Sequence, residues 1–335
     1  MRYLCFSPEG GRVLVAGGEH MVNGEARVWN VMTGEPLTPP MRHALHVSHA
    51  CFSPDGCWVA TASSDQTVRI WDSRSGNQVG ATLKHPLPVW FVEFSPDRRH
   101  LLTAGRERMW RLWDVATEAS SIERYQSSGY QRTFTEASWR VLTNAFASGQ
   151  GFQYPDGHSL VSIAFDRDAR RLITAGGDRN AQIREVPNGQ PIGQPLKHDY
   201  PVWRAAFSPD GRLAATAASE SNLEGPGETS IWVAATGEPA APVINQEGAS
   251  GDLVFSPDGP RLATASAVMT TESHGVQLWE IAAGRLIGTL LHHESSISRV
   301  AFSPNGRWLA TGGTDSVARL WDAATLQPSG PPLRP

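Results

Sequence analysis

The chain contains very little cysteine, which bears on the compartment in which it folds. Only three cysteines occur among its 335 residues, and they are Cys5, Cys51 and Cys57. A small, odd number argues against a disulfide framework and favours a reducing compartment, so we expect the protein in the cytoplasm. Cys5 and Cys51 each precede a phenylalanine by one residue, and we expect them to face each other as small buried groups rather than as a redox pair.

The chain also lacks an excess of basic charge and any long hydrophobic run. It carries 29 Lys and Arg against 33 Asp and Glu, a formal net charge of −4. A nucleic-acid-binding surface needs a clustered excess of Lys and Arg, so we expect no nucleic-acid partner. No apolar run is long enough to cross a bilayer, and residues 1–30 contain no signal-peptide pattern, so we expect no membrane association.

Motifs for catalysis, cofactor binding and metal binding are missing from the sequence as well. It contains no phosphate-binding loop, nucleophile elbow or zinc motif. His43, His46 and His49 are spaced like metal ligands on a helix, but they lie in and before a strand pattern. Side chains on a strand alternate between faces, so this spacing does not bring them together. We therefore expect no enzymatic activity, no cofactor and no metal.

What the sequence does contain is a repeated strand pattern, clearest in residues 43–72. Three alternating apolar runs, 47–52, 58–62 and 67–71, are each short enough to form a strand. Ser53-Pro54-Asp55-Gly56 separates the first two runs and has the residues of a type I turn. The stretch predicts a three-stranded antiparallel meander, to which the polar segment that follows adds a fourth strand.

This pattern recurs seven times along the chain. Each unit has an anchor phenylalanine near the end of its first strand: Phe6, Phe52, Phe94, Phe165, Phe207, Phe255 and Phe302. Six units have a third-strand tryptophan: Trp29, Trp71, Trp113, Trp232, Trp279 and Trp321. Repeats of four strands with a period in the low forties are the signature of a β-propeller. We predict an all-β, seven-bladed propeller of four-stranded antiparallel blades that forms one domain over residues 1–335, because a single blade cannot bury its own faces.

The repeats resemble the WD-repeat (WD40) family. The Trp-Asp dipeptide stands at 71–72, 113–114 and 321–322, with looser versions at 29–30 and 279–280. Gly-Glu-Pro turns and Leu-Lys-His strand ends make the repeats similar to bacterial members of the family. The resemblance implies a non-catalytic scaffold that binds protein or peptide partners, as a monomer or as a module of a larger assembly.

The resemblance also implies hydrogen-bonded tetrads of His, Ser or Thr, Asp and Trp inside the blades. Three units match this pattern, and the candidate residues are His43, Ser63 (or Thr61 on the same face), Asp65 and Trp71; His85, Thr103, Glu107 and Trp113; and His293, Thr311, Asp315 and Trp321. The other four units lack one or more members. A tetrad of this kind superficially suggests a catalytic triad, but its repetition and its terminal Trp donor favour a structural role.

Between units three and four the chain carries an insertion at about residues 118–157. Residues 134–148 have a helical rhythm of apolar positions, with a capping-box pair at Thr133 and Glu136. We expect one short helix here, which serves either as a partner-binding lid or as a brace on the propeller.

The two ends of the sequence bear on how the propeller closes. Residues 326–335 align with the fourth-strand segment 189–198 of another unit. We therefore expect every blade to take its strands from one unbroken segment, with closure resting on apolar packing of blade one against blade seven. The alternative is that the chain is a piece of a longer protein.

A candidate partner-binding site lies near blades three to five. Trp90 and Trp203 both stand four residues before an anchor phenylalanine, and Arg106 and the insertion residue Trp139 complete a composition typical of binding hot spots. The alternative is that both indole rings plug the mouth of the channel. Two other functions stay open: an enzyme or small-ligand binder that uses the central channel, for which Glu93 is the main carboxylate, and a degenerate repeat protein without a dedicated partner.

Overall fold

The computed structural model is all-β in the part of the chain that it describes. It describes residues 3–18, 23–95, 97–105, 109–116, 120–124, 130–131, 160–168, 170–185, 190–220, 226–247, 250–266, 275–291, 297–313, 315 and 317–334. Within these ranges every named element is a strand and no helix occurs. The helix predicted over 134–148 and the tip of the insertion lie outside the described residues.

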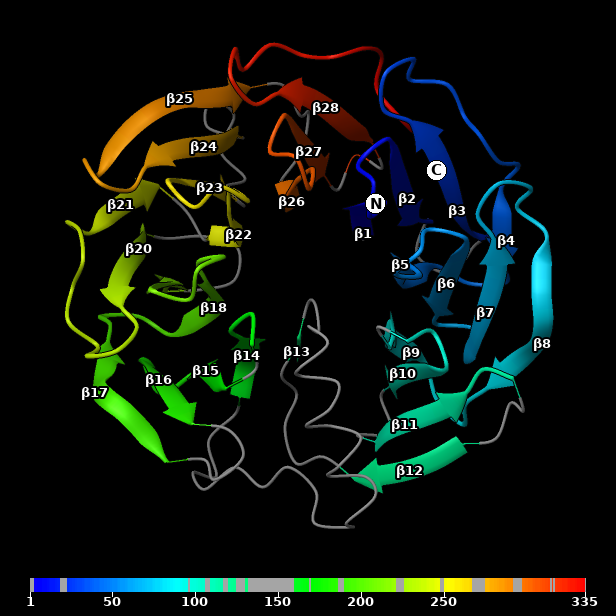
Figure 1. Ribbon diagram of the computed structural model, residues 1–335, viewed down its shortest axis with the longest axis horizontal. Helices are drawn as coiled ribbons and strands as arrows, with labels where there is room; N and C mark the ends of the chain where they lie inside the picture. The colour runs from blue at the N-terminus through cyan, green and yellow to red at the C-terminus, as the bar shows by residue number, and fades with distance from the viewer. Residues whose placement is uncertain are drawn as a thin grey trace. The chain divides into compact units, whose positions relative to one another are not determined.

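The strands form seven consecutive sheets, which we call blades 1 to 7 (Figure 1). The chain divides into two compact units, and the first comprises Met1–Tyr125, Ala145–Phe152 and Ser303–Pro335. It contains blade 1 with strands β1 (Tyr3–Phe6), β2 (Arg12–Gly17), β3 (Gly24–Asn30) and β4 (Met41–His43); blade 2 with β5 (Val47–Phe52), β6 (Trp58–Ser63), β7 (Thr67–Asp72) and β8 (Gln78–Lys84); blade 3 with β9 (Val89–Phe94), β10 (His100–Gly105), β11 (Met109–Asp114) and β12 (Ser120–Arg124); and β27 (Trp308–Gly313) and β28 (Ala318–Asp322) of blade 7.

The second unit comprises Gln126–Asn144 and Gln153–Phe302. It contains blade 4 with β14 (Leu160–Phe165), β15 (Arg171–Gly176), β16 (Asn180–Glu185) and β17 (Pro191–Lys197); blade 5 with β18 (Val202–Phe207), β19 (Leu213–Ser219), β20 (Pro226–Val233) and β21 (Ile244–Glu247); blade 6 with β22 (Ser250–Phe255), β23 (Arg261–Ser266), β24 (Gly275–Glu280) and β25 (Arg285–Leu291); and β26 (Ile297–Phe302) of blade 7. A two-residue strand from the insertion, β13 (Tyr130–Gln131), pairs in parallel with β14.

The strand order of the sheets confirms the predicted seven-bladed β-propeller. In every blade consecutive strands are neighbours, so each blade is built from one unbroken segment of chain. Blade 7 has three strands, and residues after β28 follow its outer edge through the isolated bridges Trp321↔Pro328 and Ala318↔Leu333. The fourth strand of blade 3, β12, lies inside the range expected for the insertion, because the chain completes this blade before it leaves the repeat.

The turn chemistry read from the sequence explains how first and second strands connect. In blade 2 the amide of Gly56 donates to the carbonyl of Ser53 at 2.8 Å, and Gly56 has φ 69°. The Ser53 hydroxyl donates to Asp55 at 2.6 Å, which stiffens the turn. A positive φ at the last turn position is the conformation that glycine adopts without a steric penalty.

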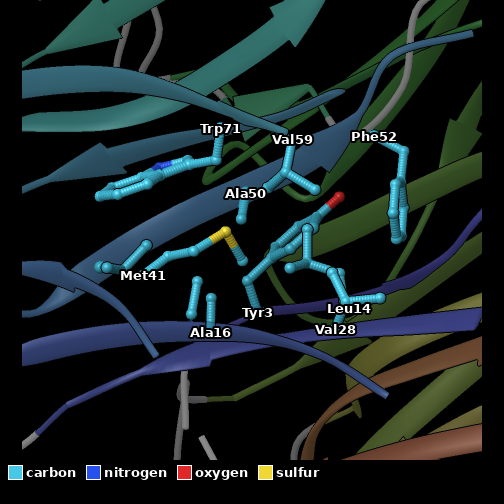
Figure 2. Packing of buried hydrophobic residues seen from close by; sticks show 11 residues of the cluster. Tyr3, Leu14, Ala16, Val28, Met41, Ala50, Phe52, Val59 and Trp71 are labelled. Atoms are coloured by element: carbon cyan, nitrogen blue, oxygen red, sulfur yellow. The ribbon is translucent and has the colours of Figure 1, made fainter. Parts of the chain in front are cut away.

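Apolar side chains fill the spaces between neighbouring blades. Figure 2 shows the core between blades 1 and 2, where Leu14 and Val28 pack with Val59 and Trp71. Complete burial of such side chains contributes about 1.5–3 kcal/mol each. Side-chain packing between sheets therefore holds neighbouring blades together, and hydrogen bonds such as that from Arg12 of blade 1 to the carbonyl of Gly56 in blade 2, at 2.8 Å, add to it.

The first unit shows how blade 7 packs against blade 1. Strand β1 contacts β27, and Leu333 is fully buried. A methyl group added to Gly34 in blade 1 would lie 2.9 Å from Cδ of Pro331, just as one added to Gly76 in blade 2 would lie 3.0 Å from Cδ of Pro39 in blade 1. The contact between blades 7 and 1 thus repeats the contact between blades 1 and 2, as the predicted apolar packing requires.

The two cysteines at equivalent positions do not face each other, contrary to the expectation from sequence. The Cys5 Sγ lies 3.8 Å from the carbonyl oxygen of Ala50, on the side of β1 that faces blade 2. Cys51 packs instead with Val89 and Phe94 of blade 3. Side chains at equivalent positions of successive blades are directed toward the following blade, so Cys5 faces blade 2 and Cys51 faces blade 3. Burial raises the pKa of the Cys5 thiol to about 12, which makes it unreactive.

Candidate functional site

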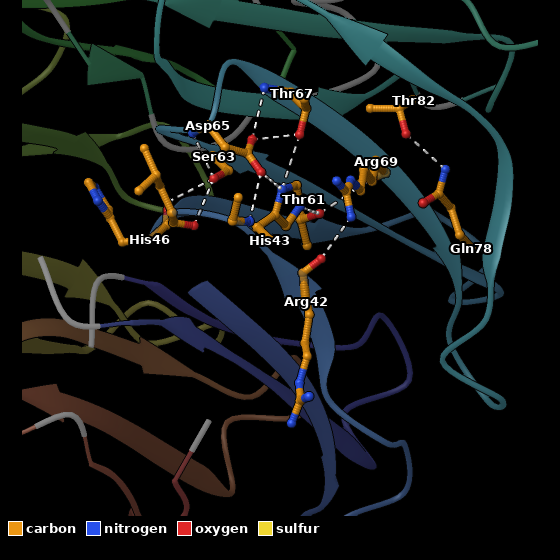
Figure 3. Close-up of polar contacts among 12 residues, drawn as sticks. Arg42, His43, His46, Thr61, Ser63, Asp65, Thr67, Arg69, Gln78 and Thr82 are labelled. Carbon is orange, nitrogen blue, oxygen red and sulfur yellow. Dashed lines mark hydrogen bonds and ion pairs between the residues drawn. The ribbon is translucent and has the colours of Figure 1, made fainter. Parts of the chain in front are cut away.

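Blade 2 contains a four-residue hydrogen-bonded network that links three strands. Figure 3 shows three of its members, His43, Thr61 and Asp65. The indole N–H of Trp71 donates to Oγ1 of Thr61 at 2.8 Å, and Thr61 Oγ1 lies 2.7 Å from Nε2 of His43. The opposite ring nitrogen of His43, Nδ1, lies 3.0 Å from Asp65 Oδ2. His43 ends β4 of blade 1, so the network ties the outer strand of one blade to the next blade.

The network fixes the hydrogen-bonding role of each member. An indole only donates, so Thr61 accepts from Trp71 and donates its own proton to Nε2 of His43. This assignment leaves the proton of the imidazole on Nδ1, where Asp65 accepts it. Burial raises the pKa of Asp65, but the hydrogen bonds from His43 and Thr67 outweigh that effect and hold the pKa well below its usual range.

The hydroxyl in this network belongs to Thr61 and not to Ser63, which corrects the first of our two sequence candidates. Trp71 pairs with Val59 across the sheet, so Thr61 is its diagonal neighbour on the same face. Ser63 lies four residues from Val59, about 13 Å along the strand, and is out of reach of the indole. Its hydroxyl donates instead to the carbonyls of Leu45 and His46, at 2.9 and 3.1 Å.

Blade 3 has the same network as far as the structure describes it. Trp113 donates to Thr103 Oγ1 at 2.8 Å, and Thr103 Oγ1 lies 3.1 Å from His85 Nε2. The fourth candidate of blade 3, Glu107, lies outside the described residues.

Blade 7 repeats the indole–hydroxyl bond of the network. Trp321 donates to Thr311 at 2.9 Å. Asp315 accepts from the amide of Val317 at 3.1 Å and from Arg319 at 3.0 Å. His293, the remaining candidate of this blade, lies outside the described residues.

Blade 5 contains a network that sequence analysis missed. Trp232 donates to Thr216 at 2.7 Å, Thr216 lies 2.8 Å from His198 Nε2, and His198 Nδ1 lies 2.7 Å from Glu228. The acid comes from the third strand, where the longer hairpin of this blade places Glu228 beside the imidazole. The spacing of the histidine could have indicated this network, because His198 stands nine residues before Phe207, as His43 does before Phe52. Burial lowers the pKa of His198 although Glu228 accepts its proton.

Blades 1 and 6 contain reduced versions of this arrangement. In blade 6, Trp279 donates to Thr264 at 3.1 Å. In blade 1 the equivalent of Thr61 is Val15, which has no hydroxyl. The buried indole N–H of Trp29 consequently has no acceptor within the described part of the chain.

These networks contain the hydroxyl, imidazole and carboxylate groups of a catalytic triad, but the hydroxyl cannot act as a nucleophile. The Thr61 and Thr103 hydroxyls are completely buried and already accept an indole proton. A nucleophile must reach the substrate, and its oxygen must be free to attack. The arrangement positions strands instead.

The candidate partner-binding residues fall in different parts of the structure. Trp90 is the second residue of β9 in the first unit, and Trp203 is the second residue of β18 in the second unit; both side chains are half-buried. The Trp203 indole donates to the carbonyl of Ser219 at 3.1 Å. Arg106 and Trp139 lie outside the described residues, so the grouping of all four stays a prediction.

The three closely spaced histidines have three different surroundings. His43 joins the network of blade 2, and His46 Nε2 lies 3.2 and 3.1 Å from the hydroxyls of Ser48 and Ser64. The ring of His49 packs against Tyr3, with centroids 3.9 Å apart. No group of three or more His, Cys, Asp or Glu that could hold a metal ion occurs among the described residues.

Glu93 on β9 is the carboxylate singled out for a channel site. Burial raises its pKa to about 8, and its charge acts on the two buried thiols of Cys5 and Cys51. A carboxyl group that is mostly protonated at neutral pH is a weak partner for cations.

Comparison with known proteins identifies the repeat. The model of the WD domain, G-beta repeat, matches residues 36–72, 77–114, 189–223 and 284–322. Each match begins near the outer strand of one blade and extends into the next, across the His-to-Thr spacing of blades 2, 3, 5 and 7. No curated protein matches the chain significantly. Among the described residues, no helix is long and apolar enough to span a membrane. Four matched repeats within seven consecutive blades of one strand order show that the chain belongs to the WD-repeat (WD40) family.

Proposed function

We propose that this chain is a non-catalytic scaffold in the cytoplasm that binds partner proteins or peptides through the ends of its first strands in blades 3 to 5. WD40 repeats generally mediate protein–protein interactions, and propellers of this family are typically non-catalytic. The three free cysteines of the chain support the proposed cytoplasmic location, because free thiols fit a reducing compartment.

The observation that carries the proposal is the pair of half-buried tryptophans at equivalent positions of β9 and β18. Each is the second residue of its first strand and keeps part of a large ring in contact with solvent. Trp90 is preceded closely by Leu87, whose side chain is 41% exposed. The bond from Trp203 to Ser219 holds its indole in one orientation, so a partner binding there would pay little conformational entropy.

The proposal is tested by affinity capture from cell lysate with the wild type beside Trp90→Ala and Trp203→Ala. Met32→Ala is the matched control, because Met32 is an apolar side chain 66% exposed in a turn of blade 1. We expect each tryptophan variant to lose partners that the control retains, at equal melting temperature. Identical capture by all four proteins would contradict the proposed site.

A further inference from the structure

An arginine at the start of a second strand connects blade 1 to blade 2. Arg12 begins β2, and its Nη2 donates to the carbonyl oxygen of Gly56 at 2.8 Å. Gly56 lies in the turn between the first two strands of blade 2. The same guanidinium lies 5.2 Å from the ring centroid of Phe52, the anchor phenylalanine of that blade. Arg12 thus holds the following blade by a charge-assisted hydrogen bond and a cation–π contact, which we together call the arginine latch.

The second unit repeats the arginine latch. Arg171 begins β15 of blade 4, and its Nη2 donates to the carbonyl oxygen of Gly211 in blade 5 at 2.6 Å. Its guanidinium lies 5.5 Å from the ring centroid of Phe207. Arg261, which begins β23 of blade 6, lies 5.6 Å from the ring centroid of Phe302 in blade 7. Equivalent arginines therefore reach the anchor phenylalanine of the next blade.

Blades 2 and 3 are connected by an arginine in the opposite direction. Arg98, in the turn between the first two strands of blade 3, donates to the carboxylate of Asp55 in blade 2. Its guanidinium lies 5.7 Å from the ring centroid of Trp58. Among the described residues, an arginine thus bridges blades 1 and 2, 2 and 3, 4 and 5, and 6 and 7.

The turn that blade 6 presents to blade 5 meets no arginine latch within the described ranges. Leu213 begins β19 where Arg171 begins β15, and it packs against the cluster that contains Phe255 of blade 6. A methyl group added to Gly211 would lie 2.8 Å from the guanidinium of Arg171. One added to Gly259, the equivalent glycine of blade 6, would have no atom within 4 Å. The space that the guanidinium fills between blades 4 and 5 is therefore open between blades 5 and 6.

The other end of this contact differs in the same sense. Between blades 4 and 5, His198 lies 2.8 Å from Thr216 and 2.7 Å from Glu228, so its imidazole connects the outer strand of blade 4 to blade 5. The residue nine positions before the anchor phenylalanine of blade 6 is Gln246. Glutamine has no imidazole, so the relay from a hydroxyl to a carboxylate does not form there.

We propose that the contact between blades 5 and 6 is the hinge of this propeller, where neighbouring blades separate more readily than at the contacts that an arginine bridges. Local opening costs less free energy where fewer interactions oppose it. Blade 5 stays attached to blade 4 through Arg171 and His198, so the opening leaves these two blades together. The inference concerns the conformation of the chain and does not depend on the proposed partner site.

The inference is tested with cysteine probes at three equivalent alanines, in the whole chain carrying Cys57→Ser to remove its exposed thiol. Ala16, Ala175 and Ala217 are each the fifth residue of their second strand, and all are almost completely buried. They face the contacts between blades 1 and 2, 4 and 5, and 5 and 6. The rate at which a maleimide labels each introduced thiol under native conditions is measured by mass spectrometry.

We expect Ala217→Cys to be labelled about tenfold faster than Ala175→Cys or Ala16→Cys. Global unfolding exposes all three thiols alike, so a difference between their rates reports local separation of blades. Leu213→Arg supplies a guanidinium beside Gly259 and should slow labelling at residue 217 by about tenfold, because hydrogen bonds to charged groups are the strong ones. Arg171→Leu should speed labelling at residue 175 by a similar factor.

The matched control is Arg212→Gln, which changes the neighbour of Leu213, an arginine whose side chain is 86% exposed, and should alter neither rate. Equal labelling of the three probes overturns the inference. So does a rate at residue 217 that Leu213→Arg leaves unchanged, or an effect of Arg212→Gln as large as that of Leu213→Arg. If Leu213→Arg does not fold, the comparison of the three probes and the effect of Arg171→Leu decide.

Discussion

At the scale of single residues, the indole of Trp29 shows what the network does for the other blades. Trp29 is buried, and its N–H has no acceptor among the described residues because Val15 stands where blade 2 has Thr61. Strand register in the two blades is the same, with Val13 opposite Trp29 and Val59 opposite Trp71. A hydroxyl at residue 15 would therefore lie where the indole can reach it.

We predict that Val15→Thr stabilises the protein. The new hydroxyl accepts the proton of Trp29, and satisfying a buried donor contributes about 1 kcal/mol to the free energy of unfolding. Urea denaturation measures the change. Val13→Thr is the control, since it buries a hydroxyl directly opposite Trp29 without the network geometry and should destabilise. Equal effects of the two substitutions would show that the missing acceptor is irrelevant.

The raised pKa of Glu93 predicts how the free energy of unfolding changes with pH. Its pKa rises from 4.5 to about 8 on folding, so the native state holds the proton more tightly than the unfolded chain. The stabilising contribution of this group is complete below the unfolded pKa and is lost as the pH rises through the folded pKa. Its side chain keeps some contact with solvent, so the loss is smaller than the limit of about 1.4 kcal/mol per pH unit.

We expect Glu93→Gln to remove this component, so that the variant loses less stability than the wild type between pH 5 and pH 8 in urea denaturation. Glu238→Gln, which changes an exposed carboxylate of blade 5, is the matched control and should follow the wild type. A variant at residue 93 whose stability falls as steeply as that of the wild type would rule out the buried carboxyl group as the cause.

At the scale of single elements, the network of blade 2 tests which hydroxyl supports the third strand. Thr61→Val leaves the indole of Trp71 and Nε2 of His43 without their shared partner, at a cost of about 1–3 kcal/mol for each buried group. Ser63→Ala removes a hydroxyl on the same face that bonds only backbone groups, and should cost less. Thermal denaturation of the two variants would contradict the geometry if Ser63→Ala were the more damaging.

The networks also predict a ranking of local stability among blades. Blades 2 and 5 have complete networks, whereas blade 1 lacks the hydroxyl. We expect the amides of β7 and β20 to exchange with solvent more slowly than those of β3, because fewer interactions oppose local opening in blade 1. Hydrogen exchange resolved by peptide would contradict this if β3 were the best protected of the three strands.

The elements themselves were largely predictable from the sequence, and the exceptions have physical causes. Strands form at the apolar runs 47–52, 58–62 and 67–71, and the turn at Ser53-Pro54-Asp55-Gly56 forms as predicted, because both depend on local chemistry. The network of blade 5 was missed because its acid, Glu228, comes from a position on the third strand that only the paired sheet reveals. The choice between Thr61 and Ser63 likewise needed the register, since both lie on one face.

At the scale of the whole molecule, repetition predicted the fold and left the site open. Seven equivalent phenylalanines were enough to predict the number of blades and that one continuous segment of the chain forms each blade. The candidate partner-binding residues do not repeat, so no periodicity constrains them.

Packing of the C-terminal segment gives a prediction at this scale. Leu333 is fully buried beside the outer edge of blade 7, as Leu196 is in the outer strand of blade 4. Leu333→Ala and Leu196→Ala should both cost about 2–5 kcal/mol, because each leaves a cavity in a buried region. Chemical denaturation that finds Leu333→Ala harmless would show that packing of the C-terminal segment on blade 7 contributes nothing to stability.

The central claim is that partners bind at the loop ends of the first strands, around Trp90 and Trp203. The most direct measurement is hydrogen–deuterium exchange of the chain alone and in complex with a partner that it captures. We predict new protection in the segments at 85–91 and 199–204, and none in the outer strands β8, β17 and β25. Protection confined to those outer strands, with both tryptophan segments unchanged, would contradict the account.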